Sequence, residues 1–329
     1  PATSVTGVVQ HLLAVQGQDP RGARLAIRAR SAGLSAADVD HALTTDRSLL
    51  ITTLNRGTLH LVTAEDYWWL QVLTTPPLLT ASARRLAQEK VPPDDAERAV
   101  VAVESALATD GPLTRSQLRD RVDAAGVRTE GQAHVHILLL ASLRGLIVRG
   151  PMVAGDHAFV LVRDWLGAPP QLPARDVLLA ELARRYLAGH GPAAETDLAK
   201  WAGLPLRDVR RGLTAIAPQL ATRDDGLASL AGQDRVGEIP PPRLLGSFDP
   251  LLHGWVSREF VLGGLTGIVT TNGVFRPFAL VGGQAAATWT LTRGQVKLAP
   301  FAPLAPADET ALQADAREVV RYLAASAPD

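Results

Sequence analysis

The side chains whose type and spacing could do chemistry are two glutamines one residue apart near the N-terminus, Gln16 and Gln18. A glutamine amide does not titrate near neutral pH, so it cannot act as a general base. It can, however, orient a water molecule or a substrate through its oxygen and its N–H groups. The pair by itself favours an ordinary helix terminus, and a role in chemistry needs support from other parts of the chain.

The residues that follow the pair place it in the secondary structure. Asp19 and Pro20 are typical of an N-cap and a first helical residue, because an Asp side chain accepts from unpaired N–H groups and proline has no amide hydrogen to lose there. Gln16 and Gln18 should therefore lie in a tight turn between two helices. Turns held by a rigid scaffold often carry functional residues.

Composition limits the classes of protein and site. A chain of 329 residues predicts two or three domains. Hydrophobic residues make up 47% and charged residues 20%, and the chain has neither a long apolar run nor a signal-type segment, so we expect a cytoplasmic protein without membrane association. The absence of cysteine excludes disulfides, thiolate metal sites and a cysteine nucleophile. His134 and His136 do not share a helix face, so we expect neither a metal nor a cofactor.

The charge balance permits a nucleic-acid partner without requiring one. The formal net charge is zero, which argues weakly against DNA for the chain as a whole. Of the 33 basic residues only Lys90, Lys200 and Lys297 are lysines, which leaves 30 arginines. Arginine recognises phosphate and guanine through two parallel hydrogen bonds, although a high-GC genome would produce the same bias.

The first 92 residues predict a winged helix. Apolar spacing predicts helices over 5–15, 20–32 and 36–43, and β-branched residues predict strands over 48–54 and 58–62 around a turn at 55–57. Further helices should cover 64–90, and 92–95 is expected to be a linker. We expect this first module to span residues 1–92.

Two further modules repeat this order, over residues 96–168 and 174–236. The Gly-Pro at 111–112 precedes Leu118 by the interval that separates the Gly-Pro at 191–192 from Leu198, which indicates a tandem repeat. The third module contains the clearest helix-turn-helix, with helices over 195–202 and 205–217. Its residues Arg207, Arg210 and Arg211 lie off the apolar stripe, as phosphate contacts or as a solvated basic face.

The last part of the chain, residues 240–329, predicts a β-rich lobe. Strands are expected over 262–271, 274–281, 288–292 and 296–299, followed by a helix over 306–325. The preceding segment 247–258 mixes aromatic, acidic and basic residues in what should be mostly loop. Such a mixture can form a site.

Three passages resemble the winged-helix DNA glycosylases, in particular the AlkZ-like branch. They are the Gln-x-Gln of Gln16 and Gln18, the run Leu-Asn-Arg-Gly-Thr-Leu-His-Leu at 54–61, and Asp-Pro-Leu-Leu at 249–252 with Gly254, Trp255 and Arg258. Their order covers nearly the whole chain. A glutamine at position 18 is similar to the AlkZ-like branch, since the related YcaQ-like branch has aspartate there. Gly17 stands where the family usually has a larger apolar residue, and Pro1 suggests that a tail precedes this numbering.

The resemblance implies an α+β fold, with three tandem winged helices and the β-rich lobe forming a C around duplex DNA. It implies excision of N7-alkylated purines, including interstrand crosslinks, with Gln16 and Gln18 as the catalytic pair, in a context of resistance to a self-made DNA-alkylating natural product. Arg56, His60 and Arg258 are then candidates for holding the DNA backbone. No lysine occurs in the first 89 residues, so we expect a monofunctional glycosylase rather than a Schiff-base lyase. A monomer should suffice, because the repeats lie within one chain.

Two other classes of protein fit the same elements. A non-enzymatic transcriptional regulator would bind a promoter sequence without releasing a base. A protein-interaction scaffold would show no salt-sensitive DNA binding, since phosphate contacts make DNA affinity fall steeply with salt.

Overall fold

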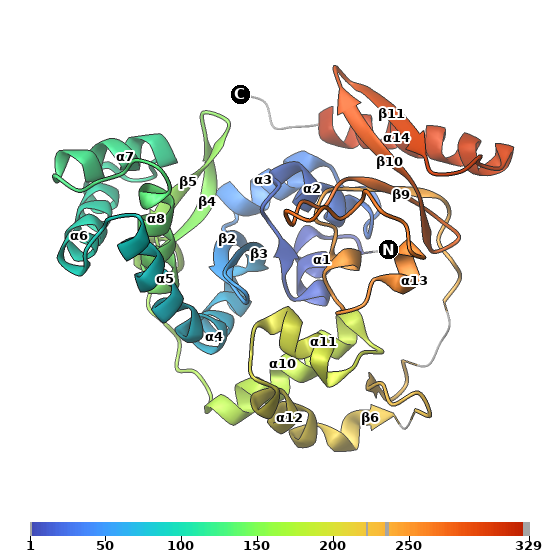
Figure 1. Ribbon diagram of the computed structural model, residues 1–329, viewed down its shortest axis with the longest axis horizontal. Coiled ribbons are helices and arrows are strands. Elements are labelled where there is room, and N and C mark those ends of the chain that lie inside the picture. The colour runs from blue at the N-terminus through green and yellow to red at the C-terminus, as the bar shows by residue number, and fades with distance from the viewer. Residues whose placement is uncertain (1, 222, 234–236, 325–329) are drawn as a thin grey trace. The chain divides into compact units, whose positions relative to one another are not determined.

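The computed structural model describes residues 2–221, 223–233 and 237–324, and the chain divides into two compact units (Figure 1). The first unit combines the two ends of the sequence, Pro1–Val39 and Leu179–Asp329, and the second is Asp40–Leu178. Helix α3 (Ala36–Thr44) and helix α10 (Arg175–His190) run across the two boundaries. No helix in the described ranges is long and apolar enough to cross a membrane.

The N-terminal part of the first unit begins with helix α1 (Val5–Leu12), the two-residue strand β1 (Val15–Gln16) and helix α2 (Pro20–Arg28). Asp19 caps α2, because its Oδ1 accepts from the Arg21 amide at 3.0 Å and Pro20 is the first helical residue. The predicted cap is therefore confirmed. Gln16 ends a strand, however, and only Gly17 and Gln18 remain between that strand and the cap.

The middle part of the first unit contains the predicted helix-turn-helix. Helix α11 (Glu195–Ala202) ends at Gly203, whose left-handed backbone allows the turn, and helix α12 (Leu206–Ala215) follows. A 3-10 turn (Ala217–Gln219) leads into strand β6 (Leu220–Ala221), which pairs with strand β7 (Ser229–Leu230).

The C-terminal part of the first unit is a sheet covered by a helix. Its strands lie in the order β11-β10-β9-β8, with β8 (Arg243–Leu245), β9 (Phe278–Val281), β10 (Gln284–Thr292) and β11 (Gln295–Pro300). Helix α14 (Pro306–Ala324) contributes Leu312, Val319 and Tyr322 to a core that also contains Leu25 of α2 and Trp289 of β10. This core joins α2 to the sheet.

The strand expected over 262–271 is wrong. The segment holds the end of the short helix α13 (Glu259–Leu262) and then loop, with a single bridge between Val269 and Phe275. Gly263, Gly264 and Gly267 all have positive φ, a conformation that a regular strand does not contain. The apolar residues there pack from a loop into the core around Leu252 and Phe278.

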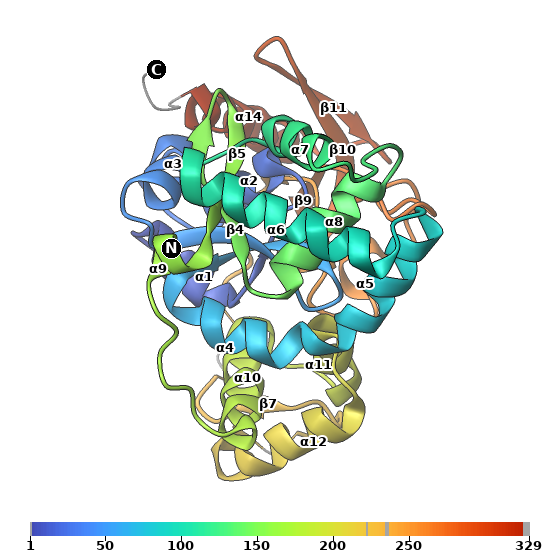
Figure 2. The same ribbon diagram turned by 90° about the vertical axis from the view of Figure 1, so that its left-hand side faces the viewer.

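The second unit is built on two hairpins and several helices, and the helices face the viewer in Figure 2. Strands β2 (Leu49–Leu54) and β3 (Thr58–Thr63) pair in antiparallel register, as do β4 (Ile147–Val153) and β5 (Asp156–Leu161). β2 pairs with β4 at Ile51 and Arg149, so the hairpins share one sheet. The helices of this unit are α4 (Ala64–Thr74), α5 (Pro76–Gln88), α6 (Pro93–Asp110), α7 (Arg115–Ala124), α8 (Ala133–Leu143) and α9 (Val162–Leu166).

The linker expected at 92–95 is also wrong, because Pro93 is the first residue of α6. Proline fits a first helical position, and Asp94 and Asp95 suit the positive end of the helix dipole. Prolines and acidic residues at a helix start resemble a linker in sequence. The capping box of Thr114 and Gln117 at the start of α7 is confirmed.

Candidate catalytic and DNA-binding site

The two glutamines contact each other. The side-chain amide of Gln16 donates from Nε2 to Oε1 of Gln18. Gln16 is 5% exposed, whereas Gln18 is exposed. The buried amide therefore fixes the orientation of the exposed one, and its N–H group is used for that purpose.

This contact determines which polar groups of the pair are available. Oε1 of Gln16 is buried and has no hydrogen-bond partner among the described residues. Oε1 of Gln18 accepts one hydrogen bond and has a second lone pair, and its own NH₂ group is a donor. The pair can thus accept a hydrogen bond from a water molecule and donate one to a neighbouring oxygen.

The loop of the third sequence passage is joined to helix α2 by an ion pair. Both guanidinium nitrogens of Arg30 donate to Asp249, Nη1 to Oδ2 at 3.0 Å and Nη2 to Oδ1 at 2.7 Å. Asp249 is fully buried, and it also accepts from the Leu251 amide at 2.9 Å at the start of a 3-10 turn (Pro250–Leu252). The Asp249 carboxylate raises the pKa of Arg30 against the opposing effect of burial. Both carboxylate oxygens of Asp249 are therefore used in contacts within the protein, which indicates a structural role.

Arg258 lies against the same loop. Its Nε donates to the Leu252 carbonyl at 2.7 Å, and its guanidinium lies 5.1 Å from the ring centre of Phe275. Partial burial lowers its pKa from the ordinary value. A DNA contact by Arg258 stays a prediction.

Arg56 and His60 belong to the hairpin β2–β3 of the second unit. Arg56 is half-buried in the turn, next to Asn55, which adopts a positive φ of 54°. His60 is buried, and its Nδ1 lies 2.9 Å from the Thr58 carbonyl. Burial, and secondarily the charge of Arg56, lower the pKa of His60 to about 3. A neutral ring is a weak ligand for phosphate, so Arg56 is the stronger candidate of the two.

The three arginines of α12 are exposed, as the sequence predicts for its outward face. Arg207 lies 3.4 Å from Asp208, and Nε of Arg210 donates to both carboxylate oxygens of Glu195, at 3.1 and 2.9 Å. Arg211 also has a polar partner. Exposed ion pairs are weak, so phosphate groups can compete for these side chains. Their role in binding DNA stays a prediction.

Comparison with known proteins decides the family. A profile of the family described as DNA glycosylase AlkZ-like matches residues 9–322. The chain belongs to the AlkZ-like DNA glycosylase family. Its fold is similar to that of the Streptomyces sahachiroi DNA glycosylase AlkZ, with a TM-score of 0.78 and 23% sequence identity, over 98% of this chain and 92% of that chain. No curated protein sequence matches this chain.

These findings confirm the family recognised from the three passages, and with it a glycosylase that acts in DNA repair. They also confirm a mixed α and β fold. The roles of individual residues in this AlkZ-like protein stay predictions.

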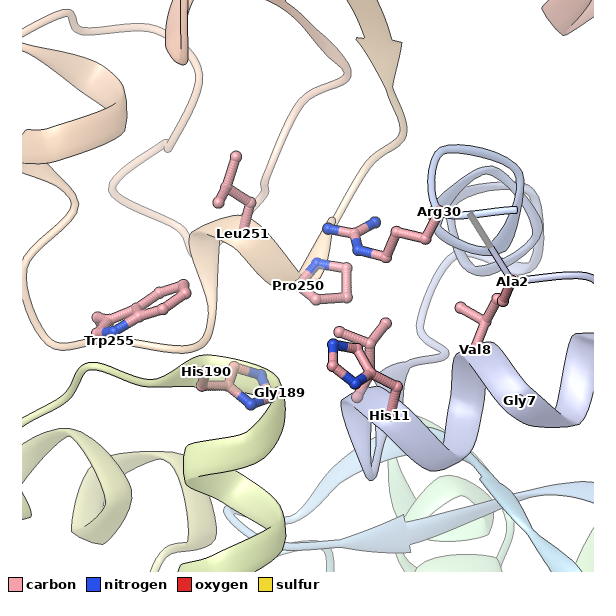
Figure 3. Close-up of a pocket in the computed structure, with 11 residues that line it drawn as sticks. Ala2, Gly7, Val8, His11, Arg30, Gly189, His190, Pro250, Leu251 and Trp255 are labelled. Carbon is pink, nitrogen blue, oxygen red and sulfur yellow. The ribbon is translucent and has the colours of Figure 1, made fainter. Parts of the chain in front are cut away.

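Sequence reasoning missed a pocket in the first unit of this AlkZ-like protein. It has a volume of about 610 Å³. In Figure 3 the side chains of Arg30 and His11 lie on either side of Pro250, with His190 and Trp255 further along. The His190 ring stacks on Tyr186 with centroids 4.9 Å apart, and burial lowers the pKa of His190 to about 4. Neither Gln16 nor Gln18 lines this pocket.

The pairing of Arg30 with Asp249 was missed as well. The two residues are 219 positions apart, and no local pattern connects them. The only available signal was the presence of Asp249 in the third passage.

Proposed function

We propose that this AlkZ-like protein hydrolyses the N-glycosidic bond of N7-alkylated purines in double-stranded DNA, including purines joined in an interstrand crosslink. The observation that carries the proposal is the contact between Gln16 and Gln18 in a chain of this family. Two amides that hold each other suit a substrate whose leaving group needs little help. The name of the AlkZ neighbour, a DNA glycosylase, supports the cleavage of an N-glycosidic bond in DNA.

The chemistry of the substrate explains why amides suffice. Alkylation at N7 makes guanine cationic, so the electron pair of the breaking bond neutralises the departing base. The sugar becomes an oxocarbenium-like cation, water adds to C1′, and the proton of that water passes to solvent. The products are a free alkylated base and an abasic site. The protein has mainly to place the water and stabilise the sugar, and positioning supplies most of the rate gain.

The geometry suggests a division of labour. The second lone pair of Gln18 Oε1 accepts a hydrogen bond from the attacking water, which directs the water oxygen toward the sugar. Gln16 donates to that same oxygen and thereby fixes its direction. In this role Gln16 supports Gln18 without touching the water.

The enzyme is monofunctional in this proposal. A lyase step needs an amine that forms a Schiff base with the sugar. The first lysine in the chain is Lys90, far along the sequence from the glutamine pair. Hydrolysis to an abasic site with an intact DNA backbone is therefore the expected end point.

DNA binding in this proposal uses a monomer of three winged helices, over 1–92, 96–168 and 174–236, and a β-rich lobe over 240–329 that together surround the duplex. The hairpins β2–β3, β4–β5 and β6–β7 would be the wings. Arg56, Arg258 and the arginines of α12 would contact the DNA backbone. A crosslinked base cannot easily be extruded from the helix as most glycosylases require, and an open cleft would act on it in place.

The test is excision from a defined duplex. Protein is incubated with DNA that contains one 7-methylguanine, or one N7-linked crosslink, and alkali then cleaves abasic sites. Strand scission at the modified purine, with release of the free base, is the expected result. Scission before alkali treatment would contradict the monofunctional mechanism. Sequence-specific binding without base release would overturn the proposal in favour of a transcriptional regulator.

A further inference from the structure

We propose that Gly22 and Asp249 are positioning residues for the glutamine pair, acting through helix α2. The segment 246–249 packs against α2 and fixes its position, and the position of α2 in turn determines where Gln18 lies. The inference rests on the proposed function of the pair. Every contact that carries it lies within the first compact unit.

The first contact is a close approach of two backbones. A Cβ atom on Gly22 would lie 2.2 Å from the carbonyl oxygen of Ser247. A Cβ atom on Gly246 would lie 2.9 Å from Gly22 Cα. The obstacles are backbone atoms, which cannot rotate away as a side chain would. Alanine has the better helix propensity, so the close approach is the physical reason that glycine fits at this position in the first turn of α2.

This contact lies one turn from Gln18. Gly22 is in the first turn of α2, and the same added Cβ would lie 3.3 Å from Cβ of Asp19. Asp19 caps the helix and directly follows Gln18 in the chain. If this turn shifts away from Ser247, Asp19 moves with it, and Gln18 moves because it is joined to Asp19 by a peptide bond.

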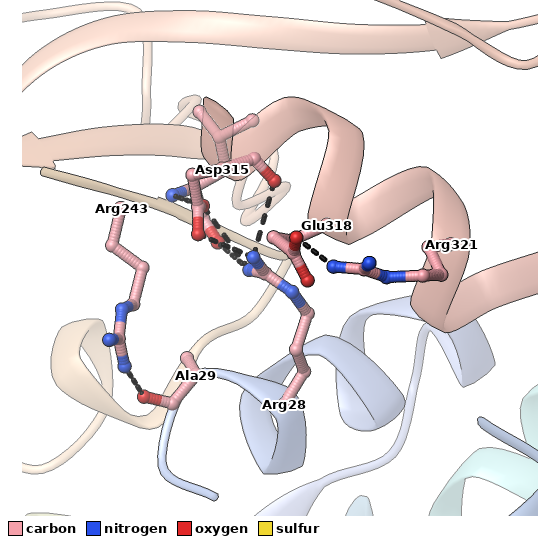
Figure 4. A network of polar contacts seen from close by, with 7 residues as sticks. Arg28, Ala29, Arg243, Asp315, Glu318 and Arg321 are labelled. Atoms are coloured by element: carbon pink, nitrogen blue, oxygen red, sulfur yellow. Dashed lines mark hydrogen bonds and ion pairs between the residues drawn. The ribbon is translucent and has the colours of Figure 1, made fainter. Parts of the chain in front are cut away.

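The rest of α2 cannot move to relieve such a shift. The Tyr322 hydroxyl donates to the Arg24 carbonyl at 2.9 Å. Asp315 accepts from Arg28, with Nη1 to Oδ2 at 3.2 Å (Figure 4). Just beyond the helix, Arg30 is held by the buried Asp249. The far end of α2 is thus fixed to α14 and to the same loop that meets Gly22. The backbone must therefore shift near Gln18 to make room for an added methyl group.

The distinction between positioning and mere stability can be measured with a matched control. A Cβ on Gly212 of α12 would lie 2.4 Å from the Leu179 carbonyl oxygen, a similar overlap between two helices of the same unit. Gly212→Ala and Gly22→Ala should therefore destabilise the fold comparably. Only Gly22→Ala should affect the glutamines. Misplacement of a reacting group by about 1 Å can cost a hundredfold in rate.

The experiment measures single-turnover excision of 7-methylguanine at saturating protein, where differences in DNA affinity do not count. We expect Gly22→Ala to lower the rate constant by about 100-fold and Gly212→Ala to change it less than about threefold. Asp249→Asn, which keeps the side-chain size, is the second variant; assayed at a temperature at which circular dichroism shows it folded, it should lower the rate at least tenfold. Equal rates for the Gly22 and Gly212 variants would overturn the proposal.

A readout without catalysis separates this proposal from the proposed function. The side-chain amide signals of Gln16, assigned in ¹⁵N-labelled protein with a Gln16→Asn variant, report the contact with Gln18. These signals should shift in Gly22→Ala and in Asp249→Asn but stay in place in Gly212→Ala. Unmoved signals in both test variants would refute positioning. Shifted signals in a protein that excises nothing would retain positioning and reject the glycosylase mechanism.

Discussion

Arg30 and Asp249 form a bidentate ion pair that joins the segment just after helix α2 to a loop 219 positions further along the chain. Asp249 is completely buried, and the Arg30 side chain is 25% exposed. In a medium of low polarity each charge depends on the other, because removal of one leaves its partner unpaired at a high desolvation cost.

Asp249→Asn should therefore destabilise the protein strongly. The neutral side chain leaves the Arg30 guanidinium without a counter-charge, and we expect the free energy of unfolding to fall by about 3 kcal/mol. Urea unfolding followed by circular dichroism measures the change. Glu195→Gln, which breaks an exposed ion pair with Arg210, is the control and should leave the midpoint almost unchanged. Similar midpoints for the two variants would show that the buried pair is not needed for stability.

Gln18 should tolerate aspartate better than alanine. Aspartate keeps an oxygen that can orient water and is a better base, whereas alanine removes the group that accepts from Gln16. We expect Gln18→Asp to keep partial single-turnover excision of 7-methylguanine and Gln18→Ala to lose about 100-fold or more. Gln88→Ala, on an exposed position of α5, serves as a control. Unchanged excision by Gln18→Ala would remove Gln18 from the mechanism.

His60 should make the protein less stable in acid. The unfolded state takes up a proton on this ring below a pKa of 6.5, but the folded state does so only below about 3. Since the unfolded state binds more protons between these values, stability falls as pH is lowered through this range. The contribution from pH 7 to pH 4 is on the order of 3 kcal/mol. Urea unfolding at both pH values should show a smaller acid loss for His60→Gln than for the parent protein. An equal loss would mean that His60 becomes protonated in the folded state.

Arg56→Ala should weaken DNA binding without changing its sequence preference. A side chain that contacts a phosphate releases about one counterion, so the slope of log affinity against log salt should become shallower by about 1. Fluorescence anisotropy with a labelled undamaged duplex at several salt concentrations measures this slope. Arg98→Ala removes an exposed arginine of α6 and should leave it as it is. An unchanged slope in Arg56→Ala would exclude a phosphate contact.

Glu195 should compete with DNA for Arg210. The carboxylate holds the Arg210 guanidinium through several hydrogen bonds and raises its pKa. If Arg210 contacts a phosphate, Glu195→Ala frees it and should tighten DNA binding several-fold at low salt. The double variant Glu195→Ala, Arg210→Ala should bind more weakly than Glu195→Ala alone. Equal affinities of these two variants would show that Arg210 faces solvent and not DNA.

Local patterns in the sequence predicted the local structure well. The cap at Asp19, the capping box at Thr114 and Gln117, and the helix-turn-helix at 195–215 each depend on residues a few positions apart. The failures were also local. The apolar residues at 262–271 resemble a strand in sequence, but the positive φ angles of the glycines among them prevent a regular strand. Pro93 resembles part of a linker, although it begins a helix.

The sequence by itself determined the family, the helix that follows the glutamine pair, and the exclusion of cysteine chemistry, because these depend on residue identity and short-range spacing. Only the tertiary structure decided that Gln16 is buried and bonded to Gln18, that Asp249 neutralises Arg30, and that Gly22 meets the backbone of Ser247. The physical reason is that burial and side-chain orientation depend on how the whole chain packs, in which segments hundreds of positions apart can meet. A sequence pattern records which groups can interact, and the fold selects which of them meet.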